Sequence, residues 1–158
     1  MRINLYMSGV ARSGYLNISP FATQSVDNPQ VIRGSVSNLD EFAEDSEADE
    51  ILALSVVDFL PARNVEESIT HWVSKLRHGG SITISGLDIN LACKAVARQE
   101  IDLATANQLI YGNQSATWDH RKASLNILAV VDMLKTKGLK ITSKRFDNYD
   151  YIVKAERP

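Results

Sequence analysis

The strongest pattern of apolar and polar positions runs from residue 50 to residue 85. An apolar run at residues 51–54 is followed by a break at Leu60 and Pro61, an amphipathic segment, and an alternating run at residues 81–84. Short apolar runs bounded by turn residues are typical of strands, and an apolar period of 3.6 residues is typical of a helix. The pattern therefore predicts a strand, a crossover helix and a second strand parallel to the first.

The segment between these two strands carries the clearest helical pattern. One apolar stripe is formed by Val65, Ile69, Trp72, Val73 and Leu76. Asn64 stands where the helix begins, with Glu67 three residues later, which is the spacing of a capping box. Gly79 stands where a left-handed C-terminal cap is expected. Parallel strands joined by a helix indicate an α/β sheet with helices on both faces.

Further elements are predicted on both sides of this unit. Runs at residues 2–6, 15–18 and 31–32 predict three short strands, and runs at 139–146 and 149–155 predict an antiparallel hairpin. Helices are predicted from a cap at Asp88 to about Arg98, and over residues 102–111 and 122–137. This order predicts a three-layer Rossmann-like α/β sheet, mostly parallel with a C-terminal antiparallel hairpin.

The composition fits a single domain over residues 1–158, because 44% of the residues are hydrophobic and 23% are charged. A formal net charge of -2 gives no electrostatic footprint for nucleic acid or for an anionic membrane. No apolar run approaches the roughly 20 residues that span a bilayer, and the first residues enter a strand pattern directly. A cytoplasmic protein with no nucleic-acid or membrane partner is expected.

Few residues suggest metal or thiol chemistry. Cys93 is the single cysteine and lies in an apolar helical segment, so we expect a core residue rather than a nucleophile. The acidic stretch at residues 40–50 predicts a short helix or a solvated turn. A metal site built from its carboxylates is the alternative, with Asp40, Glu41, Glu44 and Asp45 as ligands. No zinc spacing, phosphate-binding loop or nucleophile elbow is present, so no metal is predicted.

Several phrases resemble class I S-adenosylmethionine-dependent methyltransferases. Residues 56–61 (VVDFLP) resemble the frequent "VLEHLP", and residues 72–80 (WVSKLRHGG) resemble "W-x-x-x-L-K-P-G-G". Residues 109–114 with His120 resemble the "LYG-x-Q…H" signature of a compact subgroup, and the first 18 residues resemble its "INLGCG…GYLNVD". The resemblance extends over nearly the whole chain and implies S-adenosylmethionine as cofactor, bound beyond the carboxyl ends of the strands.

This resemblance implies cofactor contacts in the loops after the first four strands. Of the family's glycine-rich turn only Gly9 remains, within residues 6–10. Ser19 matches the acidic residue that binds the ribose, and Ser35 matches the Asp that faces the adenine. The implied cofactor-binding residues are Tyr6, Ser8, Gly9, Ser19, Ser35, Val36, Ser55 and Val56.

Three residues are candidates for catalysis. Asp58 is expected just past the fourth strand, where it could orient an acceptor or take its proton; the alternative is a turn residue that caps backbone N–H groups. His120 follows a polar loop and suits a general base, or simply begins a helix. Tyr111 could contact an acceptor or form a turn after its helix. Trp118, in the same loop, is either a stacking surface for substrate or a lid anchor.

Two functions remain open. The first is a methyltransferase that acts on a small molecule or a glycan-like acceptor. The second is a non-catalytic methyltransferase-fold module that has lost the cofactor site and forms a homo-oligomer through a sheet edge or helix face. A pocket filled by Tyr6, Met7 or Phe59 would favour the second.

Overall fold

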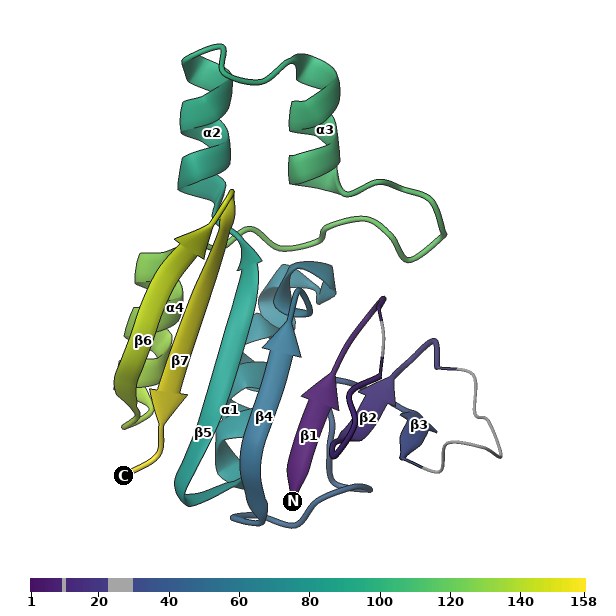
Figure 1. Ribbon diagram of the computed structural model, residues 1–158, viewed down its shortest axis with the longest axis vertical. Helices are drawn as coiled ribbons and strands as arrows, with labels where there is room; N and C mark the ends of the chain where they lie inside the picture. Colours follow the sequence, from purple (N-terminus) through teal and green to yellow (C-terminus); the bar gives the residue numbers. More distant parts are fainter. Residues whose placement is uncertain (10, 23–29) are drawn as a thin grey trace.

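A computed structural model describes residues 1–9, 11–22 and 30–158. Its centre is a seven-stranded sheet in the order β3-β2-β1-β4-β5-β7-β6 (Figure 1). The strands are β1 (Arg2–Leu5), β2 (Leu16–Ser19), β3 (Val31–Arg33), β4 (Ala48–Leu54), β5 (Leu76–Leu87), β6 (Lys140–Asp147) and β7 (Asp150–Glu156). The first five strands pair in parallel, and β7 is antiparallel to both β5 and β6. The predicted fold class is confirmed.

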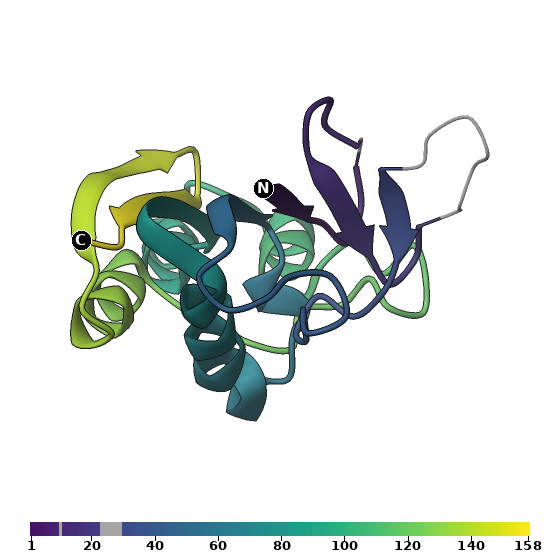
Figure 2. The same cartoon turned by 90° about the horizontal axis from the view of Figure 1, so that it is seen from below.

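Four α-helices accompany the sheet: α1 (Val65–Lys75), α2 (Ile89–Ala97), α3 (Leu103–Tyr111) and α4 (Ile127–Thr136). Two single turns of 3-10 helix, η1 (Val57–Phe59) and η2 (Ala62–Asn64), precede α1. Helices α1 and α4 pack on one face of the sheet, whereas α2 and α3 stand side by side beyond its carboxyl edge (Figures 1 and 2). No helix of the described residues is long and apolar enough to cross a membrane.

The core lies between the sheet and helices α1 and α4. The strand register aligns Ile3, Ile51 and Ile82 across three neighbouring strands, and all three are fully buried. The predicted apolar stripe of α1 is buried against them, with Trp72 at its centre. The Trp72 indole N–H donates to the Val36 carbonyl at 2.8 Å, so the buried ring has no unpaired polar group.

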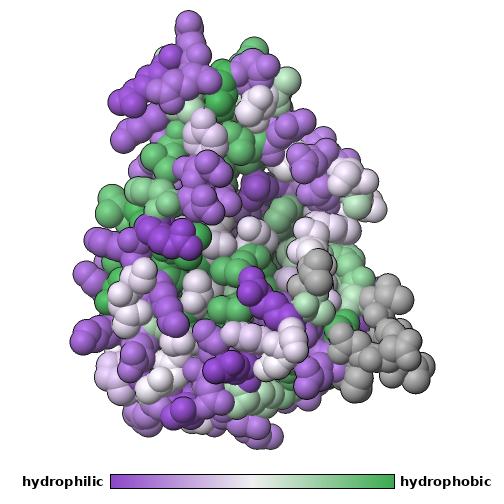
Figure 3. Space-filling view, in the orientation of Figure 1, coloured by the Kyte–Doolittle hydropathy of each residue, from purple (hydrophilic) through white to green (hydrophobic). Residues whose placement is uncertain are grey.

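The opposite face of the sheet carries polar side chains. Asn4, Leu52, Thr83 and Lys154 form one row across this face, because side chains alternate between the two faces of a strand. Figure 3 looks onto this side of the molecule, where hydrophilic and hydrophobic residues are mixed. Among the described residues no helix covers it, so the helical cover expected on both faces is found on one.

The predicted helix cap at Gly79 is wrong. Helix α1 ends at Lys75 because Leu76 is already extended and pairs with Ala48 as the first residue of β5. Gly79 lies inside β5 with a positive φ, and its N–H donates to the Arg157 carbonyl at 2.7 Å. The helix is thus ended by strand pairing that is remote in sequence, which local cap rules do not register.

Three further expectations differ from the structure. Asn64 precedes α1, but its side chain makes no cap hydrogen bond, so the predicted capping box is not formed. Cys93 is exposed, not a core residue, because the buried side of α2 is formed by Ala92 and Ala95. The helix predicted from residue 122 begins only at Ile127, capped by the Asn126 side chain. Residues 121–123 are held elsewhere by hydrogen bonds to a buried aspartate, described below.

The acidic stretch forms turns that lead into β4, in keeping with the solvated turn that was expected. Asp40 and Asp45 bond the buried Lys75 ammonium at 2.7 and 2.8 Å. These ion pairs hold the pKa of both aspartates below the ordinary value. No group of three metal-ligating side chains occurs in the described part of the chain.

Candidate functional site

A cavity of about 520 Å³ lies at the carboxyl edge of the sheet. Ser8 after β1 and Ser55 after β4 form one wall, and Phe59 of η1 adjoins them. Gln108 of α3 and Arg121 of the following loop also line it, as do Trp118 and Asp119. Open α/β sheets bind ligands beyond the carboxyl ends of their strands, and the volume falls within the range of small-molecule sites. This cavity is therefore the candidate functional site.

Three aromatic rings bridge the strand ends beside the cavity. The Trp118 ring stacks on Phe21 with 4.8 Å between centroids and 19° between planes. Phe59 meets the same indole edge-on at 5.8 Å. Phe21 comes just after β2 and Phe59 comes just after β4, so the indole joins the ends of two strands that lie on either side of β1.

Asp58 fastens the α3–α4 loop to the sheet. Its carboxylate accepts a hydrogen bond from the Leu87 N–H at 2.9 Å and forms an ion pair with Arg121. Its backbone carbonyl accepts the N–H groups of Lys122 and Ala123 at 2.7 and 3.1 Å. The loop is thus held through both the side chain and the backbone of one residue.

Burial changes the chemistry of this aspartate. Asp58 is 1% exposed, and burial raises its pKa to about 6 although Leu87 and Arg121 favour the carboxylate. Burial and the neighbouring negative charge also raise the pKa of Tyr151, whose hydroxyl has no hydrogen-bond partner among the described residues. A Cβ at Gly86 would lie 2.6 Å from Asp58 Oδ1 and 2.9 Å from the Tyr151 hydroxyl. Only glycine leaves room for this buried pair.

Arg121 connects that buried pair to the cavity. Its guanidinium lies 5.4 Å from the Phe59 ring, in the geometry of a cation–π contact. The side chain is 19% exposed and lines the cavity, whereas Asp58 behind it is closed off. Any influence of Asp58 on a ligand therefore passes through Arg121.

The sequence-predicted cofactor residues fall into two groups. Ser8 and Ser55 line the cavity. Gly9 is exposed with a φ of 121°, and no atom lies within 4 Å of the place a Cβ would take. Tyr6 is half-buried beside them, with its N–H bonded to the Ile18 carbonyl. Val10, at the end of the same loop, lies outside the described residues.

Like Tyr6 and Gly9, the other four do not line the cavity. The Ser19 hydroxyl is buried and accepts the Phe21 N–H at 3.2 Å. Ser35 is exposed and bonds the Ser37 hydroxyl at 3.1 Å. Val36 and Val56 belong to the hydrophobic core, with 4% and 0% exposure. Their assignment to cofactor binding stays a prediction.

Tyr111 and His120 lie at the two ends of the loop segment that covers the cavity. Tyr111 is 55% exposed, and its carbonyl accepts the Arg121 N–H at 3.0 Å. His120 is exposed, and its N–H donates to the Trp118 carbonyl at 2.8 Å. Neither side chain lines the cavity, and their catalytic roles also stay predictions.

Sequence reasoning missed several residues that the fold brings to this edge. Phe21, Gln108 and Arg121 belong to three segments that meet only in the folded chain. The one available signal was the position of Arg121 directly after His120, in a loop that the resemblance had already marked. No local pattern relates Phe21 to Trp118.

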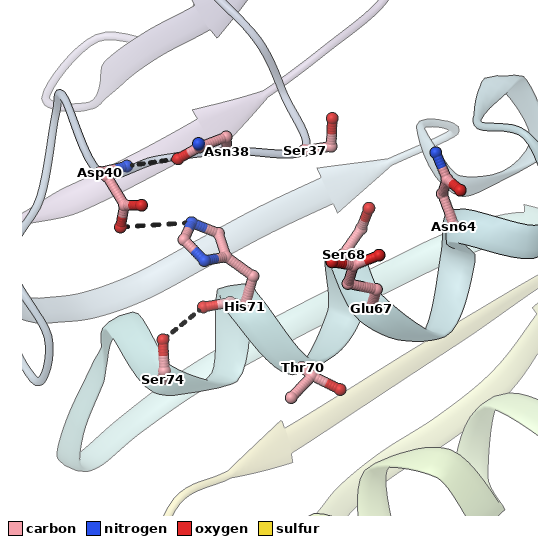
Figure 4. Close-up of a pocket in the computed structure, with 9 residues that line it drawn as sticks. All are labelled: Ser37, Asn38, Asp40, Asn64, Glu67, Ser68, Thr70, His71 and Ser74. Atoms are coloured by element: carbon pink, nitrogen blue, oxygen red, sulfur yellow. Dashed lines mark hydrogen bonds and ion pairs between the residues drawn. The ribbon is translucent and has the colours of Figure 1, made fainter.

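A second cavity, of about 700 Å³, runs along α1 between the helix and the loop after β3 (Figure 4). The figure shows His71 pointing from the helix toward Asp40, 3.9 Å away. Nε2 of His71 also accepts the Leu39 N–H at 2.8 Å, so this ring fastens the loop to the helix. The cavity lies on a helix-covered face and not at the strand ends, so we do not take it as the functional site.

No family model and no curated protein matches the chain. Solved structures match it by fold. The 1,6-didemethyltoxoflavin-N1-methyltransferase of Burkholderia thailandensis, with bound S-adenosylhomocysteine, aligns with 99% of this chain and 70% of its own, at a TM-score of 0.63 and 10% identity. A SAM-dependent methyltransferase of Thermotoga maritima aligns with 90% of this chain and 72% of its own, at a TM-score of 0.60 and 11% identity.

The magnesium protoporphyrin IX methyltransferase of Synechocystis, also with bound S-adenosylhomocysteine, aligns over 92% of this chain and 66% of its own, with a TM-score of 0.56 and 13% identity. Other matches are much longer proteins. The chain spans 35% of an O-methyltransferase family protein from Burkholderia thailandensis and 45% of a protein from Bordetella parapertussis. These similarities show that the chain has the fold of class I S-adenosylmethionine-dependent methyltransferases.

Proposed function

We propose that this chain is a small S-adenosylmethionine-dependent methyltransferase with a small-molecule acceptor. The cavity of about 520 Å³ between Ser8 and Ser55 carries the proposal, because it lies where the first and fourth strands end. Two proteins of similar fold contain S-adenosylhomocysteine, which supports the choice of cofactor.

The residues present fit a cofactor that is held by hydroxyl and backbone groups. Ser8 and Ser55 supply hydroxyls that can donate or accept hydrogen bonds, and the open space at Gly9 admits a ligand close to the backbone. The position that the resemblance assigns to a ribose-binding carboxylate is Ser19, whose hydroxyl is engaged with the Phe21 N–H. We therefore expect weaker binding than a charge-assisted site would give.

The bound cofactor would supply a methyl group on a sulfonium, which is a good leaving group. The task left to the chain is to position an acceptor and exclude water. Phe59 and Gln108 line the same cavity as the serines and offer a surface for the acceptor. His120 is our candidate for accepting its proton, and Arg121, set by Asp58, acts as a positioning residue.

The aromatic cluster favours a second candidate function, a binding module without catalysis. Trp118 is packed between Phe21 and Phe59 across the ends of β2 and β4, where a bound nucleoside would pass. A chain that keeps its indole there permanently has no room for that nucleoside. The two candidates differ in whether S-adenosylhomocysteine binds.

The test is the melting temperature of the protein with S-adenosylhomocysteine. A ligand present at 100 times its dissociation constant adds about 2.7 kcal/mol of stability, which for a domain of this size raises the melting temperature by roughly 5–10 °C. We expect a rise of this order at millimolar ligand. Ser8→Phe should abolish the rise, because its ring fills the cavity mouth.

Ser143→Phe is the matched control, since Ser143 is exposed on β6 at the far edge of the sheet. It should respond to ligand like the unmodified protein. An unchanged melting temperature for the unmodified protein would reject the methyltransferase proposal in favour of the module. Equal loss of the response in both variants would place the ligand away from the cavity.

A further inference from the structure

The loop from residue 112 to residue 126 is held over the carboxyl edge at two separate points. One is the Trp118 ring, packed on Phe21 and Phe59. The other is the set of bonds from Arg121, Lys122 and Ala123 to Asp58, described above. The first point consists of ring contacts on a surface where Phe21 is 43% exposed. The second consists of hydrogen bonds and an ion pair to a residue that is 1% exposed.

The two attachment points differ in how easily a ligand could disrupt them. Ring contacts at a partly exposed surface are individually weak, whereas breaking a buried ion pair is costly because it leaves a buried charge without its partner. Between the points, residues 114–120 form a compact unit, because the Asp119 carboxylate accepts the Ser115 hydroxyl and N–H. Gly112, with a φ of 86°, lies just before this unit. Displacing the Trp118 ring therefore does not require breaking the bonds that hold Arg121, Lys122 and Ala123 to Asp58.

The Trp118 indole also has the shape of a ligand ring. Indole and adenine are both flat, bicyclic systems of similar size, and bases stack well on aromatic side chains. The indole lies nearly parallel to Phe21 and is bounded by the edge of Phe59. It contacts both rings near the strand ends, and it lines the cavity that we assign to the cofactor.

We propose that Phe21 and Phe59 form the seat of the cofactor's adenine ring, and that the Trp118 indole occupies this seat until the cofactor displaces it. This inference rests on the proposed function, since it concerns how the same ligand enters. In the free protein the Trp118 side chain therefore occupies the adenine site. Cofactor binding requires this side chain to leave the site. The bonds to Asp58 keep the loop attached throughout.

The test compares Trp118→Leu with Trp118→Phe by calorimetric titration with S-adenosylhomocysteine. Leucine cannot stack, so the variant loses the internal competitor and should bind roughly three- to tenfold more tightly than the unmodified protein. Phenylalanine keeps a ring and should leave the affinity nearly unchanged. Homocysteine, which lacks the adenosine, should show no gain in the leucine variant.

Three outcomes separate the inference from the function on which it rests. Tighter binding by Trp118→Leu supports the inference. Equal or weaker binding by that variant overturns it and leaves the proposed function standing, with Trp118 as a passive surface or as a direct partner of the ligand. Absence of binding by the unmodified protein and by Trp118→Leu rejects the proposed function, and the inference fails with it.

Fluorescence gives a second readout that does not depend on the variant's stability. The protein has two tryptophans, and Trp72 is fully buried. Saturation with S-adenosylhomocysteine should therefore increase acrylamide quenching through Trp118 alone. The Trp118→Phe protein, which retains only Trp72, should show no increase. Unchanged quenching of the unmodified protein at saturation would overturn the displacement of Trp118.

Discussion

At the scale of single residues, the environment of Asp58 in the folded chain indicates a different role from the one suggested by its position in the sequence. Its place after the fourth strand suggested a group in contact with the acceptor. The side chain is instead closed off, paired with Arg121 and bonded to the Leu87 N–H. A carboxylate in this setting orients a neighbour and is itself sensitive to pH, because burial disfavours its charged form.

This environment predicts a particular pH dependence of stability. Burial raises the pKa of Asp58 from an ordinary value of 3.8 to about 6, so between these pH values the folded protein holds a proton that the unfolded chain releases. The free energy of unfolding therefore falls as the pH rises from about 4 to about 6, by about 3 kcal/mol at most from this group.

Urea denaturation of the unmodified protein and of Asp58→Asn across that range measures the effect. The difference in unfolding free energy, unmodified minus variant, should decrease as the pH rises, because only the unmodified protein carries the titrating group. Asp132→Asn, at an exposed position on α4, should follow the unmodified protein. Parallel curves for the unmodified protein and Asp58→Asn would contradict the raised pKa.

At the scale of elements, one aspartate begins two helices. Asp88 Oδ1 accepts the Leu91 N–H at 3.1 Å in the first turn of α2, as the sequence predicted. Its Oδ2 accepts the Ile127 N–H at 2.8 Å in the first turn of α4. The side chain is 2% exposed, so it links the end of β5 to two helices that are far apart in sequence.

Loss of this carboxylate should cost more than loss of an ordinary cap. Asp88→Ala leaves two partly buried N–H groups without partners, for an expected loss of about 2–3 kcal/mol. Asp102→Ala removes a single exposed cap, the bond to the Thr105 N–H at 2.7 Å, for about 1 kcal/mol. Urea midpoints followed by circular dichroism give both values. Equal losses would show that the second bond of Asp88 adds no stability.

At the scale of the whole molecule, the sheet has helices on one face and polar side chains on the other. The open face is stabilised by contacts within the sheet itself: the Glu50 carboxylate accepts the Tyr15 hydroxyl at 2.6 Å and lies 3.9 Å from both Arg2 and Lys154. Such a face tolerates water, and the core lies on the other face, closed by α1, α4 and the segments after β3 and β4.

Neighbouring residues of β5 test this arrangement. Ile84 is fully buried on the helix-covered face, and Thr83 is half-buried on the open face. Ile84→Ala should lower the free energy of unfolding by about 2–4 kcal/mol, because it creates a cavity in the core. Thr83→Ala should cost less than about 1 kcal/mol, as for most surface substitutions. A loss at Thr83 as large as that at Ile84 would mean that this face is covered in solution.

The sequence by itself determined the strands, the stripe of α1 and the cap at Asp88, since these depend on residues a few positions apart. The family resemblance read from the sequence also named Ser8 and Ser55, which line the cavity at the carboxyl edge. The order of the predicted strands and helices along the chain was enough to predict the fold class.

The tertiary structure decided which side chains meet. Trp118 reaches Phe21, and Arg121 reaches Asp58, through the path of one loop across the strand ends. Pairing of Leu76 with Ala48 ends α1 before its expected cap. These contacts join residues that are distant in sequence, and their free energies depend on packing and burial that no local pattern records.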